Sequence, residues 1–305
     1  MKKVSVVIIN YNSSEYTIEC VKSITELTPR DFTYEIIIVD NNSQSSDLDV
    51  LIASVQDIEV VKIVKSQINL GFSGGNMKGV SCSDAQYIFF LNNDCVLLNN
   101  NLSILYHFMQ VNADAGICTG QMFNTDMSFH HSFNYFPTVK LKLFGSSLLR
   151  FLSPSRYPSK KIVYKSAIRV PFVTGAAMFI DFKFFSEIGG FDTHYFLYCE
   201  EEDICYRLKK NGYAAYLVPE ARFIHHRGKS TKRNLDFEYE NYISLFYFFK
   251  KHFSYAEYMI LKSIYFFKNI RKFYRNADYV KLAMFILKGA PEKYSLRYKQ
   301  KTAKV

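Results

Sequence analysis

The chain has 305 residues, of which 49% are hydrophobic and 22% are charged, and its formal net charge is +10. This composition supplies a sizeable core and excludes a chain that is disordered over long tracts. No apolar run approaches the roughly 20 residues of a membrane-spanning helix, and the apolar run near the amino terminus is too short for a secretory signal. We therefore expect a cytoplasmic protein, and its six scattered cysteines, none in a CxxC pair, predict reduced thiols.

The first part of the chain alternates β-branched runs with helical stretches. A strand over residues 4–9 precedes a helix with apolar positions at Ile18, Val21 and Ile24, which Pro29 ends. This alternation predicts an α/β fold of βαβ units, with a mostly parallel Rossmann-like sheet and helices on both faces. Five further segments read as strands of this sheet: EIIIVD, IEVVKIV, QYIFFL, ADAGICTG and GAAMFID.

Four polar clusters follow the apolar runs, at residues 10–12, 40–43, 69–76 and 92–94. In an open parallel sheet, ligands bind outside the carboxyl ends of the strands. The clusters therefore predict one shared binding face.

The second half of the chain is less regular. Residues 121–170 contain three prolines and many Ser and Lys residues, and they predict a long, mobile loop over the binding face. Residues 235–288 read as helices. We place a catalytic region over 1–232 and a basic, aromatic helical region over 233–305.

Positive charge is concentrated near the carboxyl terminus. Residues 222–305 hold 19 Lys and Arg against 6 Asp and Glu, whereas residues 1–221 hold 19 against 22. Tyr and Phe are interleaved with these cations in YISLFYFFKKHF and KSIYFFKNIRKFYR, which suits peripheral contact with an anionic membrane surface. The alternative is a helical subdomain with a solvated basic face. No nucleic-acid-binding module is present, so we expect no nucleic-acid partner.

Three polar clusters contain residue types that bind nucleotides and metals. Asp40 at a strand end can accept a hydrogen bond from a base or ribose, although it could equally cap a turn. NLGFSGGN (69–76) lets backbone N–H groups approach phosphate, although alone it is more often a turn. Asp94 of NND can hold a hard cation, and His225 at a later strand end could join it.

Residues 200–203 are four successive acids in GGFDTHYFLYCEEEDICYR. Packed like charges are costly, so a purely structural role is unattractive. On a helix Glu200 and Asp203 share a face while Glu201 points elsewhere. A carboxylate here can act as a general base toward a sugar hydroxyl, and the alternative is a solvated first turn that favours the helix dipole.

Taken in order, several segments resemble family 2 of the inverting glycosyltransferases, particularly its rhamnosyltransferase-like members. The resemblance spans residues 4–231 and implies a GT-A fold, with a nucleotide-sugar half over about 1–120 and an acceptor half over 121–232. The matching segments are VSVVIINYNS, EIIIVDNNSQ, NLGFSGGN, FFLNNDCVL, VTGAAMFID, GGFDTHYFLYCEEEDICYRLKKNGY and PEARFIHHRGKST.

The resemblance also implies roles for individual residues. Glu201 falls on the catalytic base, with Asp203 and Arg207 supporting it. Asp94 and His225 fall on ligands of Mg²⁺ or Mn²⁺, and Gly175 lies near the acceptor. The positions beside the donor nucleotide are Asn10, Asn12, Asp40, Asn42, Gly71, Gly75, Asn92 and Asn93.

Three positions depart from the family pattern. Asn92 stands where the first acid of the DXD metal motif is expected, which puts the strength of metal binding in doubt. Met77 stands where many relatives have a second Asn. Glu201 replaces the more general Asp and moves the base by about one bond length.

The resemblance predicts an inverting, metal-dependent hexosyltransferase of cell-surface polysaccharide synthesis. Rhamnose from a dTDP-sugar is the first candidate donor, with UDP-hexoses next. The acceptor is expected to be a glycan or a lipid-diphosphate-linked glycan at the inner face of the cell membrane. The alternatives are a nucleotidyltransferase on a related fold and a catalytically dead GT-A binding module. The sequence leaves the oligomeric state open.

Overall fold

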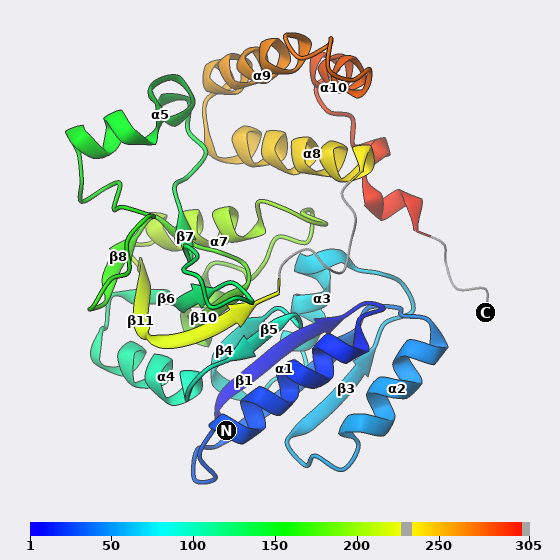
Figure 1. Ribbon diagram of the computed structural model, residues 1–305, viewed down its shortest axis with the longest axis vertical. Coiled ribbons are helices and arrows are strands. Elements are labelled where there is room, and N and C mark those ends of the chain that lie inside the picture. Colours follow the sequence, from blue (N-terminus) through cyan, green and yellow to red (C-terminus); the bar gives the residue numbers. More distant parts are fainter. Residues whose placement is uncertain (227–233, 301–305) are drawn as a thin grey trace.

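The computed structural model of the chain describes residues 1–226 and 234–300. Within these residues, nine strands form one central sheet in the order β3-β2-β1-β4-β10-β6-β11-β5, with β8 beside β11 (Figure 1). The strands of this sheet are β1 (Lys2–Asn10), β2 (Tyr34–Asp40), β3 (Val61–Lys65), β4 (Ala85–Leu91), β5 (Cys95–Leu97), β6 (Ala115–Phe123), β8 (Ile168–Val170), β10 (Ala177–Asp181) and β11 (Ala214–His225).

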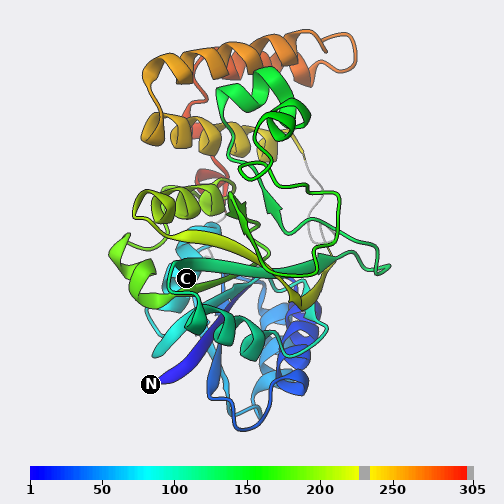
Figure 2. The same ribbon diagram turned by 90° about the vertical axis from the view of Figure 1, so that its left-hand side faces the viewer.

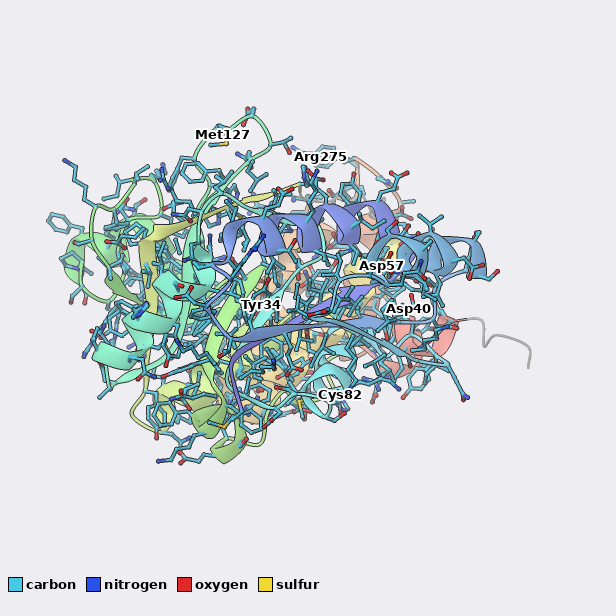
Figure 3. The ribbon with its side chains drawn as sticks, turned by 90° about the horizontal axis from the view of Figure 1, so that it is seen from below. Tyr34, Asp40, Asp57, Cys82, Met127 and Arg275 are labelled. Atoms are coloured by element: carbon cyan, nitrogen blue, oxygen red, sulfur yellow. The ribbon has the colours of Figure 1, made fainter. Side chains whose placement is uncertain are left out.

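The sheet is mixed but mostly parallel, as predicted. β3, β2, β1 and β4 are parallel neighbours, and β6 is parallel to β11, whereas β10 runs antiparallel between β4 and β6. β1 and β2 end level with each other, because Asn10 pairs in register with Asp40. Figure 3 shows Tyr34 and Asp40 at opposite ends of β2.

Helices cover both faces of the sheet because strand residues alternate between the two faces. Val6 and Ile8 pack in a cluster with α1, α2 and α4, while Val7 packs in a second cluster with α3, α6 and α7. The helix bounds are α1 (Ser14–Leu27), α2 (Ser45–Val55), α3 (Gly71–Val80), α4 (Asn101–Val111), α6 (Phe182–Glu187) and α7 (Glu200–Lys210).

The carboxyl-terminal region is helical, as predicted. It comprises α8 (Leu235–His252), α9 (Tyr255–Ile270) and α10 (Asp278–Leu287), followed by two 3₁₀ turns, η1 (Glu292–Tyr294) and η2 (Leu296–Lys299). The predicted boundary at residue 232 and residues 227–231 of the last matching segment lie outside the described residues. No helix in the described part of the chain is both long and apolar enough to span a bilayer.

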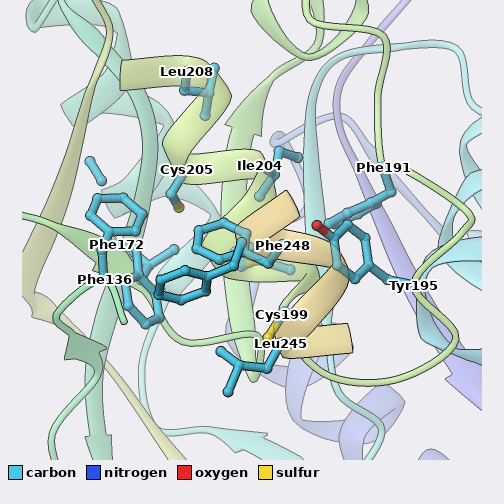
Figure 4. Packing of buried hydrophobic residues seen from close by; sticks show 14 of the residues in the cluster. Phe136, Phe172, Phe191, Tyr195, Cys199, Ile204, Cys205, Leu208, Leu245 and Phe248 are labelled. Carbon is cyan, nitrogen blue, oxygen red and sulfur yellow. The ribbon is translucent and has the colours of Figure 1, made fainter. Parts of the chain in front are cut away.

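Helix α8 is part of the core. Phe246, Phe248 and Phe249 are buried, and Phe248 packs with Ile204 and Cys205 of α7 (Figure 4). The segment YISLFYFFKKHF therefore supplies core side chains, and the prediction that its aromatic rings face a membrane is wrong. Its bulky rings are needed to fill the space between α7 and the outer helices.

The prediction of a long loop over residues 121–170 is also wrong for much of that segment. It contains α5 (Val139–Leu152), and β7 (Phe133–Asn134) pairs with β9 (Phe172–Val173). Thr138 caps α5 by accepting a hydrogen bond from the Leu141 N–H, and Gly145 kinks the helix at a φ of 72°. The prolines at 137 and 154 flank this helix, where they mark its ends and do not indicate a loop.

Candidate functional site

A cavity of about 670 Å³ lies at the carboxyl ends of β1 and β4. A volume of this size is in the range of small-molecule sites, roughly 300–1,000 Å³. One wall comes from the ends of the strands and the start of α3, and the other from the loop before α7 and from the carboxyl-terminal segment. Its polar lining includes Asn41, Asn76, Asn92, Asn93, Asp94, His225 and Lys299.

Asp94 and His225 meet at the floor of this cavity. The His225 Nε2 lies 3.0 Å from the Asp94 Oδ1, and both side chains are largely buried. Strand pairing fixes this contact, because Cys95 of β5 is the register partner of His225 at the end of β11. The sequence could suggest the pair, but only the antiparallel pairing of β5 with β11 brings the two residues together.

Asp94, Cys95 and His225 offer ligand atoms within 4.8 Å of one another, close enough for one metal ion. Burial raises the pKa of the Cys95 thiol well above its usual range, and that thiol donates to the Ala176 carbonyl. Cys95 is therefore a poor ligand. The His225 Nδ1 is buried and has no hydrogen-bond partner among the described residues, so a carboxylate and an imidazole fit a divalent ion.

The side chains beside Asp94 are held in place by hydrogen bonds. The Asn93 amide donates to the Ser13 Oγ at 2.7 Å and to the Thr17 Oγ1 at 2.9 Å. The Asn92 N–H donates to the Ala176 carbonyl at 2.9 Å. These bonds fix the end of β4 against α1 on one side and against β10 on the other.

The glycine loop 69–76 closes one side of the cavity. Gly71 has a φ of +70°, and a Cβ on it would lie 2.2 Å from the Phe196 carbonyl oxygen, so only glycine fits where this loop meets the loop before α7. Gly75 does not line the cavity; it packs against Ile9 and Asn41 at the base of α3.

Asn41 organises the glycine loop and has no assigned role in the sequence motifs. Its Oδ1 accepts from the Leu70 N–H at 2.9 Å, and its amide donates to the Gly71 carbonyl and to the Asn69 Oδ1. Asn76 also lines the cavity, and its buried amide nitrogen has no hydrogen-bond partner among the described residues. It is therefore a donor available to a ligand.

Asn10 and Asp40 are buried beneath this wall and do not face the cavity, contrary to expectation. The Asn10 amide donates to the Asp40 Oδ1 at 3.1 Å and to the Asp47 Oδ2 at 3.0 Å. The Asp40 Oδ2 accepts from the Ser43 N–H at 3.2 Å. The two residues hold the ends of β1 and β2 together, and their contact with a base or ribose stays a prediction.

Asn12 and Asn42 shape the neighbouring turns. Both adopt left-handed backbone conformations, with φ values of 51° and 69°. The Asn12 Oδ1 accepts from the Gln44 N–H at 2.7 Å. Neither residue lines the cavity, whereas the adjacent Tyr11 and Ser13 do.

The opposite wall leads into α7, which carries the predicted base. Tyr198 lines the cavity, and Tyr198 and Cys199 both have positive φ values, 72° and 65°, immediately before Glu200. Left-handed conformations at two successive non-glycine residues are strained and cluster at functional sites. The strain turns the chain sharply into the helix.

Glu201 lies in the first turn of α7, close to Gly175. A Cβ placed on Gly175 would lie 3.7 Å from its carboxylate, which also accepts a hydrogen bond from the Gly175 N–H. The next residue, Ala176, accepts from the Asn92 N–H. Gly175 and Ala176 therefore link Glu201 to the end of β4, although Glu201 is not among the residues that line the cavity.

Burial raises the pKa values of all three glutamates of the cluster, Glu200, Glu201 and Glu202. Glu200 and Asp203 are buried on one face of α7, whereas Glu201 is only half-buried, as its place on the helix predicts. A half-buried carboxyl with a raised pKa is suited to accept a proton near neutral pH.

Asp203 and Arg207 lie away from the cavity and form a buried ion-pair network. The Asp203 carboxylate accepts from the Arg207 Nε at 2.7 Å and lies 2.8 Å from the Lys251 Nζ and 2.7 Å from the His252 Nε2. This network joins α7 to α8. Neither residue lines the cavity, so their proposed support of the base would act through the position of α7.

A family model described as glycosyl transferase family 2 matches residues 5–189. The chain belongs to glycosyl transferase family 2. The matched range includes most of β1, the glycine loop and Asp94, and it ends before Glu201 and His225.

This family 2 chain is similar to curated rhamnosyltransferases over part of its length. It is 28% identical over 144 residues to the rhamnosyltransferase WbbL of Escherichia coli K12, covering 47% of this chain and 53% of WbbL. It is 37% identical over 65 residues to an N-acetylglucosaminyl-diphospho-decaprenol L-rhamnosyltransferase of Mycobacterium tuberculosis, covering 21% of each chain. The aligned part thus spans about half or less of these relatives.

The family 2 chain has the GT-A fold. It superimposes on the mannosyltransferase PcManGT of Pyrobaculum calidifontis, solved with GDP-Man and Mn²⁺, with a TM-score of 0.59 at 12% identity over 94% of this chain and 74% of that one. GalNAc-T7, solved with UDP, GalNAc and Mn²⁺, gives a TM-score of 0.57 at 17% identity over 77% of this chain and 46% of that one. At these identities the likeness concerns the fold alone.

Proposed function

We propose that this chain is an inverting glycosyltransferase that moves a hexose, with rhamnose as the first candidate, from a nucleoside-diphosphate sugar to a hydroxyl of a glycan acceptor. The observation that carries the proposal is the contact between Asp94 and His225 on the floor of a cavity of nucleotide-sugar size. Membership of family 2 supports it, as do the rhamnosyltransferase relatives.

The donor is proposed to bind with its diphosphate near Asp94 and His225. These two residues would hold Mg²⁺ or Mn²⁺, which supplies positive charge to stabilise the leaving diphosphate. Asn76 and Asn92 offer neutral polar groups beside it, and Lys299 offers a cation from the carboxyl-terminal segment. The Mn²⁺ in both structural neighbours supports a divalent ion here. dTDP-rhamnose is the first candidate donor and UDP-hexoses are next.

Glu201 is proposed to be the general base. It would take the proton of an acceptor hydroxyl while the hydroxyl oxygen bonds to the anomeric carbon and the bond from that carbon to the diphosphate oxygen breaks. A single displacement of this kind inverts the anomeric centre. The space that Gly175 leaves beside the Glu201 carboxylate is the proposed place of the acceptor hydroxyl.

Both halves of the predicted catalytic region contribute to this arrangement. Asp94 comes from the nucleotide-sugar half, over about 1–120, whereas Glu201 and His225 come from the acceptor half, over 121–232. Leu296, Lys299 and Gln300 from the predicted helical region also line the cavity. We therefore propose that the region 233–305 completes the donor site as well as packing on it.

The acceptor is proposed to be a lipid-diphosphate-linked glycan at the inner face of the cell membrane. The M. tuberculosis relative, whose name specifies a diphospho-decaprenol acceptor, supports this class. The excess of Lys and Arg in residues 222–305 supports contact with an anionic surface.

The proposal is tested by thermal unfolding with dTDP-rhamnose, UDP-glucose and GDP-mannose, each with and without Mn²⁺. A ligand at 100 times its Kd stabilises the native state by about 2.7 kcal/mol, so one donor should raise Tm only when Mn²⁺ is present. Asp94→Ala should remove the Mn²⁺-dependent part of that rise, whereas Asp57→Asn, an exposed change elsewhere, should keep it. An equal rise in Asp94→Ala would contradict the proposed metal site.

A further inference from the structure

Large apolar side chains are exposed on three helices at one end of the molecule. Helix α5 has no buried residue, and Phe151 and Leu152 at its end are 84% and 67% exposed. A helix of a globular protein normally buries an apolar stripe against the core. The outward apolar residues of α5 are therefore unexplained by the fold.

Helices α9 and α10 also expose large apolar side chains, although each of them buries its other face. On α9, Met259, Ile260 and Phe267 are exposed, while Leu261 and Tyr265 on the opposite side are buried. On α10, residues 280, 284 and 287 form an exposed apolar stripe with a spacing of four and three. Each helix thus has one apolar face toward the core and another toward solvent.

The three helices are neighbours in the fold, since α9 contacts both α5 and α10, and we call their exposed apolar residues together the apolar cap. It is defined by Phe144, Phe151 and Leu152 on α5, Met259 and Phe267 on α9, and Met284 on α10. The Nζ of Lys142 on α5 lies 5.2 Å above the ring of Tyr265 on α9, so α5 lies against α9. α9 and α10 lie side by side over α8, at the end of the molecule farthest from the amino terminus (Figures 1 and 2).

The charge around the cap is strongly positive. Residues 139–156 hold four Lys and Arg and no acid, and residues 255–290 hold seven Lys and Arg against two acids. Both acids are engaged: Glu257 accepts from the Ser254 backbone and hydroxyl at the start of α9, and Asp278 pairs with Lys281. A second copy of this face would bring like charges together, whereas an anionic lipid surface would neutralise them.

We propose that the apolar cap inserts into the interface of an anionic lipid bilayer. The helices would lie in the plane of the membrane, with the Phe, Leu and Met side chains among the acyl chains and the Lys and Arg side chains at the headgroups. Membrane insertion of the cap does not depend on the proposed transfer activity. Only its purpose does, because holding the cavity near a lipid-linked acceptor rests on the proposed function. α8 lies between α9 and α10 of the cap and the rest of the molecule (Figure 1), and so contributes to the distance between bilayer and cavity.

Flotation with vesicles tests the cap. The chain is expected to bind vesicles of phosphatidylcholine and phosphatidylglycerol (3:1), to bind pure phosphatidylcholine much less, and to bind less as salt rises. The double variant Phe151→Ser with Leu152→Ser should bind the mixed vesicles at least about tenfold less tightly, since it removes two inserted apolar side chains. Phe267→Ser on α9 should weaken binding in the same direction.

Val111→Ser is the matched control, because Val111 is 80% exposed on α4 and lies outside the cap. It should bind vesicles like the unchanged chain, and all variants should keep the Tm and the Mn²⁺-dependent donor shift. The proposal would be overturned if the unchanged chain did not bind the mixed vesicles. It would also be overturned if Val111→Ser lost as much vesicle binding as the α5 double variant. So would dimerisation in lipid-free solution that the α5 double variant abolishes, since the cap would then cover a second copy. The vesicle assay contains no nucleotide sugar. A chain that does not bind vesicles can therefore be distinguished from a chain that does not transfer sugar.

Discussion

At the scale of single residues, the environment of Glu201 decides what its carboxyl can do. Burial raises its pKa from the ordinary value of 4.5, and the hydrogen bond from the Gly175 N–H fixes its orientation. The neighbouring Glu200 is more deeply buried, and one of its carboxyl oxygens has no partner among the described residues. Glu201 has Gly175, which carries no side chain, beside its carboxylate.

Glu201→Gln should lower the rate of sugar transfer by about 10²–10⁴, because it removes the group that accepts the acceptor's proton while keeping the shape of the side chain. Donor affinity should change little, since Glu201 does not line the cavity. Transfer rates and the donor Kd measured on the same preparation check both parts. Unchanged turnover in this variant would remove Glu201 from the role of base.

The pH dependence of transfer should follow the raised pKa of Glu201. The base must be ionised to act, so at saturating donor the rate should rise with pH through a limb that lies above pH 4.5, the ordinary value for a glutamate. A pH–rate profile measures this limb, with circular dichroism at each pH to show that the chain stays folded. A limb below 4.5 would mean that the rate follows another group.

At the scale of elements, the buried carboxylate of Asp203 joins α7 to α8. Burial acts to raise its pKa, but the hydrogen bond from His252 and the charges of Arg207 and Lys251 outweigh it and lower the pKa to about 2. The folded pKa lies below the ordinary value of 3.8, so this contribution to stability is complete above pH 4 and is lost as pH falls toward 2.

Asp203→Ala should lower the free energy of unfolding by about 3–5 kcal/mol, because it leaves Arg207 and Lys251 without their shared carboxylate in a largely buried position. Denaturant unfolding at pH 7 measures the loss, and Asp57→Asn, an exposed change, should cost little. The difference between Asp203→Ala and the unchanged chain should shrink between pH 4 and pH 2. A constant difference would mean that the network is not the source of the stability.

At the scale of the whole molecule, segments from the first and the last described parts of the chain line the cavity together. Tyr11 and Ser13 follow the first strand, whereas Leu296 and Lys299 come from the last turn, η2. The Leu296 N–H donates to the buried Glu240 of α8 at 2.7 Å, which holds η2 in place. A ligand in the cavity would therefore contact segments from both ends.

Donor binding should slow amide hydrogen exchange in η2 as well as in the glycine loop and at the end of β4, because a ligand that contacts all three stabilises their closed state. Hydrogen exchange with and without donor and Mn²⁺, read by mass spectrometry, checks this expectation. Residues 101–111 of α4, outside the cavity, serve as the internal control. Protection at the glycine loop without protection of η2 would exclude the carboxyl-terminal segment from the donor site.

The sequence by itself determined the α/β alternation, the parallel core strands and the helical carboxyl-terminal region, because these depend on local periodicity and on strand ends. It also pointed to candidate site residues: residue type and strand ends suggested Asp94 and His225, whereas Glu201 was singled out only by the resemblance to family 2. Helix α5 was missed because the prolines on either side of it resemble loop markers, although they bound the helix.

Only the tertiary structure decided which candidates share a cavity. Asn10 and Asp40 end adjacent strands, hydrogen-bond to each other and are buried, whereas the next residue, Asn41, lines the cavity. The roles of Lys299 and of the aromatic residues of α8 likewise depend on contacts between distant segments. Local sequence patterns carry no information on such contacts, because burial and pairing across the sheet are fixed only when the whole chain packs.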